Sequence, residues 1–228
     1  MRSERILVWD VPVRLAHWLL VLAVAGSWLT HYGGAAWFAW HRRFGYAVLL
    51  IVGFRIVWGF VGTPPARFAA FVRGPRAIVA WLKGRAPERM GHNPVGALSV
   101  VAMLTLLLAQ ALTGLVANDE IASAGPFYGW VSHELSNRLS RFHRTNDSWL
   151  LALIGLHLAA VAWYTVVRRR RIIRAMITGR PEQHPAGATG AAAMTRSLSG
   201  RALLVALVLA ALLALALRLA PDAAPALF

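Results

Sequence analysis

The sequence contains no cysteine and few acidic residues. Its 228 residues include nine Asp and Glu but 24 Lys and Arg. Without cysteine the chain cannot form disulfides, ligate an iron–sulfur cluster through thiolates or attach a c-type haem covalently. Only 14% of the residues are charged, whereas 58% are hydrophobic and the mean hydropathy is +0.55. This composition indicates an integral membrane protein rather than a soluble domain.

Five apolar segments are each close to the length of about 20 residues that spans a bilayer as a helix. They are Val13–Tyr32, Phe44–Gly62, Val95–Ala117, Ser148–Val167 and Ala202–Ala220. Together they predict an all-α integral membrane fold.

The formal net charge of +15 is best explained by membrane orientation, not by nucleic-acid binding. Sixteen Lys and Arg residues lie before the first segment and in the connections 63–94 and 168–201, against five in the connections 33–43 and 118–147. Such residues concentrate on the cytoplasmic side of a membrane. The pattern predicts a multi-pass protein of a bacterial inner membrane, with a cytoplasmic N-terminus and a periplasmic C-terminus.

The connections between the segments carry further predictions. We expect an amphipathic helix on the cytoplasmic interface within residues 66–93, after Pro64 and Pro65 end the second span. Residues 118–142 are expected to form a loop on the outer side. The stretch 181–201 reads as a flexible linker, because it is rich in Ala, Gly and Thr.

Histidines within the apolar segments are the strongest functional signal. His143 and His157 are fourteen residues apart, which is roughly 3.9 helical turns and a rise of about 21 Å. Imidazole is a common protein ligand of haem iron, so two haems at two depths would explain the spacing. His17 is a candidate partner of His157, and either His31 or His41 is a candidate partner of His143. For His31, and for His92, His133 and His184, an interfacial position in contact with water is the simpler interpretation.

Two arginines are candidate cofactor-binding residues. Arg55 lies inside the second segment, where an unpaired charge is costly, so we expect it to meet a haem propionate or a group of a quinone site. Arg14 lies one helical turn before His17 and is a second candidate for the propionates of the same haem.

Several motifs resemble those of the prokaryotic cytochrome b561 family, which includes the b-type cytochrome subunits of nickel–iron hydrogenases. The similar stretches are Val8-Trp9-Asp10-Val11-Pro12-Val13-Arg14-Leu15-Ala16-His17-Trp18, His41-Arg42-Arg43-Phe44-Gly45-Tyr46, Phe54-Arg55-Ile56-Val57-Trp58-Gly59-Phe60-Val61-Gly62, Gly91-His92-Asn93-Pro94, Gln110-Ala111-Leu112-Thr113-Gly114-Leu115 and Arg174-Ala175-Met176-Ile177-Thr178-Gly179-Arg180. The resemblance covers about residues 8–180.

This resemblance implies a four-helix transmembrane bundle that encloses two non-covalent b-type haems. It implies His17, His41, His143 and His157 as the haem ligands, and thereby favours His41 over His31. The chain departs from the family pattern by an added fifth C-terminal helix, on which a further subunit is expected to dock. The expected organisation is a di-haem domain over residues 1–180, a linker over 181–201, and a final helix and tail over 202–228.

The implied function is transmembrane electron transfer between membrane quinone and a redox partner, such as a periplasmic c-type cytochrome or a dehydrogenase. The chain would then be an electron-transfer subunit of a quinone-linked oxidoreductase. The alternative is a histidine-based transition-metal or proton transporter, or a haem-free membrane anchor. A transporter of this kind needs acidic partners within the membrane, and the expected spans contain no Asp or Glu.

Overall fold

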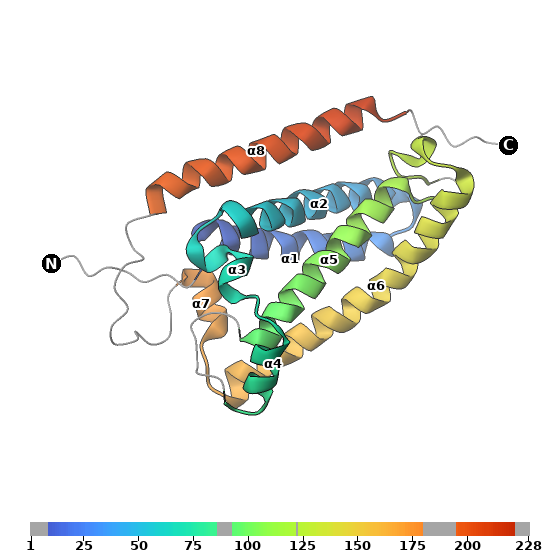
Figure 1. Cartoon of the computed structure of the whole chain (residues 1–228). Coiled ribbons are helices and arrows are strands. Elements are labelled where there is room, and N and C mark those ends of the chain that lie inside the picture. The colour runs from blue at the N-terminus through green and yellow to red at the C-terminus, as the bar shows by residue number, and fades with distance from the viewer. Residues whose placement is uncertain (1–8, 86–92, 122, 180–194, 222–228) are drawn as a thin grey trace. The chain divides into compact units, whose positions relative to one another are not determined.

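The computed structural model describes residues 9–85, 93–121, 123–179 and 195–221, and within them the chain is all-helical (Figure 1). These ranges contain no strand; their β-structure is an isolated bridge between Asn118 and Ala124. The predicted all-α fold is confirmed.

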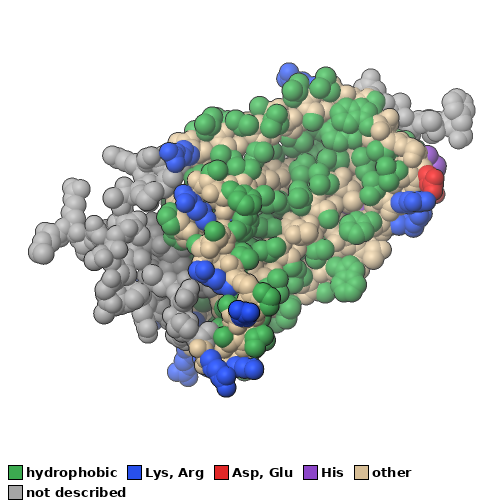
Figure 2. Space-filling view, in the orientation of Figure 1, with side chains coloured by type: hydrophobic (Ala, Val, Ile, Leu, Met, Phe, Trp, Pro, Cys, Tyr) green, Lys and Arg blue, Asp and Glu red, His purple; other side chains and the backbone are tan. Residues whose placement is uncertain are grey.

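Among the described residues, five helices are long and apolar enough to cross a membrane, as the sequence predicts. They are α1 (Val11–His31), α2 (Phe38–Val61), α5 (Pro94–Val116), α6 (His133–Ala162) and α8 (Thr195–Leu219). The shorter elements are η1 (Ala35–Trp37), η2 (Pro64–Ala66), α3 (Phe68–Phe71), α4 (Pro75–Leu82), η3 (Tyr128–Trp130), the π-helical η4 (Trp163–Val167) and α7 (Ile172–Thr178). Figure 2 shows that the visible face is mainly hydrophobic, as contact with lipid requires.

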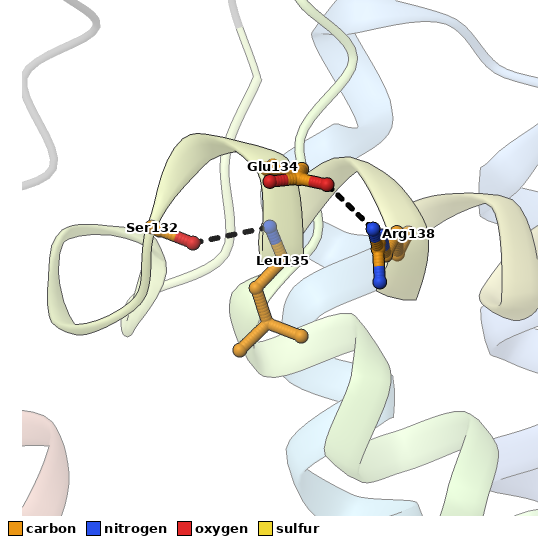
Figure 3. Close-up of polar contacts among 4 residues, drawn as sticks. All are labelled: Ser132, Glu134, Leu135 and Arg138. Carbon is orange, nitrogen blue, oxygen red and sulfur yellow. Dashed lines mark hydrogen bonds and ion pairs between the residues drawn. The ribbon is translucent and has the colours of Figure 1, made fainter.

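The spanning helices begin earlier than the hydropathy of the sequence predicts, most of all α2, α6 and α8. α2 begins at Phe38, and α6 begins at His133, within the stretch expected to be a loop. At the start of α6 the Ser132 hydroxyl accepts a hydrogen bond from the Leu135 backbone N–H, at 3.3 Å, and Glu134 forms an ion pair with Arg138 (Figure 3). Hydropathy does not detect this first part of α6, because its helical turns are polar.

The expected short amphipathic helix within residues 66–93 is present as α4, Pro75–Leu82. The chain there forms η2, α3 and α4, separated by extended backbone at Arg67 and at Val72–Gly74, and residues 86–92 lie outside the described ranges. The prolines end the second span as predicted: α2 stops at Val61, and Pro64 begins η2.

Helix α8 begins at Thr195, before the expected start at residue 202, and residues 181–194 of the expected linker lie outside the described ranges. Its less exposed positions follow a three- and four-residue spacing, at Ala202, Val205, Leu209 and Leu213. That spacing marks one helix face. Leu209 lies 3.9 Å from a Cβ built on Gly53 of α2, so this face of α8 contacts α2.

The chain divides into two compact units. The first unit comprises Met1–His17, Arg55–Met103 and Leu153–Val205, and the second comprises Trp18–Phe54, Leu104–Ala152 and Ala206–Phe228. Trp58, Ala66 and Ala97 are buried in the first unit. Val52 and Leu107 belong to the buried core of the second.

Gly59 allows α3 to pack closely against α2 in the first unit. A Cβ at this position would overlap the ring of Phe68. We expect Gly59→Ala to lower the free energy of unfolding by about 1–3 kcal/mol, the usual cost of overpacking, as measured by thermal unfolding in detergent. Gly53→Ala is the matched control on the same helix, because its new methyl group meets Leu209 at an ordinary contact distance of 3.9 Å. Equal unfolding temperatures of the two variants would contradict the close packing at Gly59.

Candidate functional site

Two histidines from different helices face each other in the second unit. The ring centroids of His41 on α2 and His143 on α6 are 6.4 Å apart, with an interplanar angle of 83°. Both side chains are half-buried. Residues separated by about a hundred positions in the sequence are thus brought together as a pair.

A backbone carbonyl of a neighbouring helix orients each of these imidazoles. The Nδ1 atom of His41 lies 2.9 Å from the Ser27 carbonyl oxygen on α1, and Nδ1 of His143 lies 2.9 Å from the Gln110 carbonyl oxygen on α5. A carbonyl only accepts hydrogen bonds, so Nδ1 carries the proton on both rings and Nε2 holds the lone pair. This is the arrangement that metal-ligating histidines show when their other nitrogen donates to a carbonyl.

The distance between the rings also fits a shared metal ion. Metal–imidazole bonds are about 2 Å long, so two imidazoles on opposite sides of one ion have their ring centres about 6 Å apart. The observed 6.4 Å agrees with this separation. Gly45 lies one turn after His41, and no atom is within 4 Å of a Cβ built there, so the backbone is open beside the pair. The residues of the second unit fit a haem held by His41 and His143.

His31 is the other histidine near this pair. Its ring centroid is 5.8 Å from that of His41, but its side chain is exposed and its ring packs edge-on against Tyr32. Within the described residues His31 has no hydrogen bond to a carbonyl of the kind that orients His41. The geometry therefore favours His41 as the partner of His143.

His17 and His157 lie together in the first unit, the former on α1 and the latter on α6. They are close enough to interact electrostatically, and both are half-buried. The structure thus places His17 and His157 in one unit and His41 and His143 in the other.

Asp10 is a buried hydrogen-bond acceptor of the first unit that the sequence pattern did not indicate. Its carboxylate is only 7% exposed. One oxygen accepts a hydrogen bond from the Val13 backbone N–H, at 2.7 Å, and the other accepts from Trp58 Nε1 and Thr63 Oγ1, at 2.8 and 2.7 Å. One feature of the sequence does indicate its role: an aspartate directly before the first residue of a helix is a common N-cap.

The two predicted arginines also lie in the first unit. Arg14 donates a hydrogen bond from Nη1 to the Ile177 carbonyl in the last turn of α7, where a cation is favoured by the helix dipole. Arg55 is 8% exposed, and its guanidinium carbon lies 5.1 Å from the centroid of the Phe68 ring. A second ring, that of Phe71, lies 5.9 Å away. The Nη1 atom of Arg55 is buried and has no hydrogen-bond partner among the described residues.

An acidic and an amide side chain of α6 follow His143 closely in the chain. Asp147 lies on α6, one turn after His143 and directly before the predicted fourth span, and interacts electrostatically with His143 and His41. Asn146 is 2% exposed and donates to the Gln110 side-chain oxygen at 2.7 Å.

The other histidines have different surroundings. His133 is exposed at the start of α6 and lies 3.0 Å from the Tyr128 hydroxyl and 3.1 Å from Asn137 Nδ2, as an interfacial residue would. His92 and His184 lie outside the described residues.

Five membrane-spanning helices and paired, carbonyl-oriented imidazoles define a membrane protein equipped to hold haem. Residues 8–179 match the family described as prokaryotic cytochrome b561, and the chain belongs to that family. It is therefore a b-type haem protein of electron transfer in membranes.

Curated relatives carry the name probable Ni/Fe-hydrogenase B-type cytochrome subunit. The relative from Rhizobium leguminosarum bv. viciae is 26% identical, over 78% of this chain and 90% of its own length. The relative from Azotobacter chroococcum mcd 1 is 24% identical, over 78% and 89%, and that from Rhodobacter capsulatus is 25% identical, over 78% and 82%. No solved structure matches the chain.

The choice between His41 and His31 is testable through haem content. We expect His41→Ala to remove the haem of the second unit, because it deletes an oriented ligand, and His31→Ala to leave the haem content unchanged. Pyridine haemochrome analysis of both purified variants measures the difference. Loss of a haem in His31→Ala together with full haem content in His41→Ala would reverse the assignment.

Proposed function

We propose that the chain carries electrons across the membrane through two b-type haems, each held by two histidines. One haem binds between His41 and His143, the other between His17 and His157. The observation that carries the proposal is the pair in the second unit, whose ring separation of 6.4 Å and carbonyl-bonded Nδ1 atoms suit a shared iron. Iron with two histidine ligands exchanges single electrons and keeps no position open for oxygen.

The protein's own contribution is to keep the ligand nitrogens oriented. The Ser27 and Gln110 carbonyls hold the protons on Nδ1 of His41 and His143, so that each Nε2 remains a ligand. The Thr113 hydroxyl lies 3.2 Å from Nδ1 of His143 and provides a second polar contact there. Oriented ligands lose little conformational freedom when a metal binds.

We further propose membrane quinone as one electron-exchange partner and a redox protein as the other. The names of the relatives support a nickel–iron hydrogenase as that protein. A periplasmic c-type cytochrome or another dehydrogenase is the alternative. Purification from native membranes distinguishes them, because a hydrogenase brings nickel and iron–sulfur clusters whereas a c-type cytochrome brings covalently bound haem. A partner subunit on α8 would be retained in the same purification.

The distribution of basic residues supports a cytoplasmic N-terminus and a periplasmic C-terminus in a bacterial inner membrane. We propose residues 1–180 as the di-haem domain, followed by a linker over 181–201 and a separate final helix. The family match over residues 8–179 coincides with the proposed di-haem domain.

Haem stoichiometry tests the proposal directly. Four ligand histidines in two pairs require about two b-type haems per chain. We expect pyridine haemochrome analysis, normalised to protein by amino-acid analysis, to return this ratio. A well-folded preparation with one haem or none would overturn the two-pair assignment.

We propose that Arg55 pairs with a propionate of the first-unit haem or with a group of a quinone site. Its burial at 8% exposure and the unpaired Nη1 support an anionic partner. Arg14, which is half-buried and whose Nε atom has no hydrogen-bond partner among the described residues, is proposed for the same haem.

Replacement of Arg55 is expected to shift one midpoint potential. A reduced haem carries one more negative charge, so loss of a nearby cation lowers its potential. Arg55→Leu should therefore shift the first-unit midpoint downwards and spare the other, and should destabilise the fold by about 3–5 kcal/mol, as stranding one member of a buried pair does. Arg55→Lys should retain part of the midpoint potential and part of the stability, since lysine keeps the positive charge but lacks the planar guanidinium with its paired donors. A stable Arg55→Leu protein with both midpoints unmoved in a redox titration would reduce this arginine to a packing residue.

A further inference from the structure

We propose that Asp10 is a positioning residue for the first-unit haem: its carboxylate fixes the start of α1 and thereby the placement of His17. The inference rests on the proposed function, because it concerns a histidine assigned there as a haem ligand.

The first step is the register of α1. The Asp10 carboxylate accepts the Val13 backbone N–H at 2.7 Å, so Asp10 is the N-cap and sets the residue at which the helix begins. His17 follows seven residues later. Seven residues correspond to roughly 1.9 turns, so His17 and Asp10 lie on nearly the same face of the helix. A carboxylate anchored on that face determines which way His17 points.

The second step is the contact of α1 with α2. The other carboxylate oxygen accepts from Trp58 Nε1 at 2.8 Å and from Thr63 Oγ1 at 2.7 Å. Trp58 is completely buried, so its indole cannot follow a displaced partner without disturbing the packing around it. Charged acceptors make stronger hydrogen bonds than neutral ones. One side chain thus ties the first turn of α1 to the last turn of α2.

The third step is the chain that follows His157. Arg14 on α1 donates to the Ile177 carbonyl of α7, and Gly179 ends α7 with a φ of +78°. A Cβ on Gly179 would approach the Trp9 carbonyl oxygen to 2.7 Å, so glycine is needed for this close contact. The first turn of α1 is therefore held against α2 and against the segment that continues from the helix of His157.

This anchoring matters because metal coordination tolerates little displacement. Ligand positions must be held within about 0.5 Å for a site to function as built. Without the Asp10 contacts, the first turns of α1 would be free to fray, and His17 lies within reach of that fraying. The second-unit pair has independent anchors at Ser27 and Gln110. The effect of Asp10 is therefore confined to one haem.

The test compares Asp10→Asn and Asp10→Ala with wild type and with Ser132→Ala, a matched control that removes the N-cap of α6. The probes are haem content by pyridine haemochrome analysis and midpoint potentials by redox titration of the full chain. His17→Ala and His41→Ala assign each signal to its unit. Asparagine keeps an oxygen for the Val13 N–H but offers its amide donor, not an acceptor, to Trp58 or Thr63.

We expect Asp10→Ala to lower haem content from about two towards one per chain, with the loss confined to the first-unit signal. Asp10→Asn should lie between Asp10→Ala and wild type, with a shifted first-unit midpoint and an unchanged second one. Ser132→Ala should match wild type in all of these measurements. If Asp10→Ala does not fold, Thr63→Val, which removes one donor to the same oxygen, should still shift the first-unit midpoint alone.

Equal loss of both haems in the Asp10 variants, or unchanged haem content and midpoints in a folded Asp10→Ala protein, would overturn the inference. The proposed function would stand in that case, because it depends on wild-type stoichiometry. A wild-type chain without paired haems would instead refute the proposed function itself.

Discussion

The hydrogen bond from an imidazole Nδ1 to a carbonyl of a neighbouring helix is the interaction on which the second-unit site depends. It joins α1 to α2 through Ser27 and His41, and α5 to α6 through Gln110 and His143. The facing rings of the two histidines then bring α2 and α6 together. A buried polar ring without such a partner is costly within a bilayer. The same bonds therefore reduce the cost of burial and fix the tautomer that leaves Nε2 for a metal.

The first unit buries a charged carboxylate instead. Asp10 is nearly as buried as a core residue, yet three donors satisfy its oxygens, and Arg55 lies within its electrostatic influence. Aromatic rings of α3 cover the Arg55 guanidinium and shield it from solvent. The two units thus bury different polar groups: imidazoles bonded to neutral carbonyls in one, a charged acid and base in the other. Unequal electrostatics of this kind would give the two proposed haems unequal potentials.

Much of the fold can be predicted from the sequence. The predictions that differ from the structure do so because hydropathy does not report local helix formation. The five spans were predictable because lipid demands long apolar helices. The start of α6 was missed because hydropathy reports which residues prefer lipid, whereas a capped polar helix forms for local reasons. The amphipathic stretch after α2 was recognised by its composition, but the breaks around Val72–Gly74 were not.

The sequence by itself determined the class of protein, the number of spans and the histidines from which a haem site can be built, because hydropathy and helical period are local properties. It did not distinguish His31 from His41 by spacing, and the resemblance to a family was needed to favour one. The tertiary structure decided which imidazole meets a carbonyl and which remains exposed. It also revealed the role of Asp10, whose hydrogen-bond donors come from another helix and the residues that follow it. Contacts between helices depend on their mutual rotation and register, and the periodicity of a single helix does not fix either.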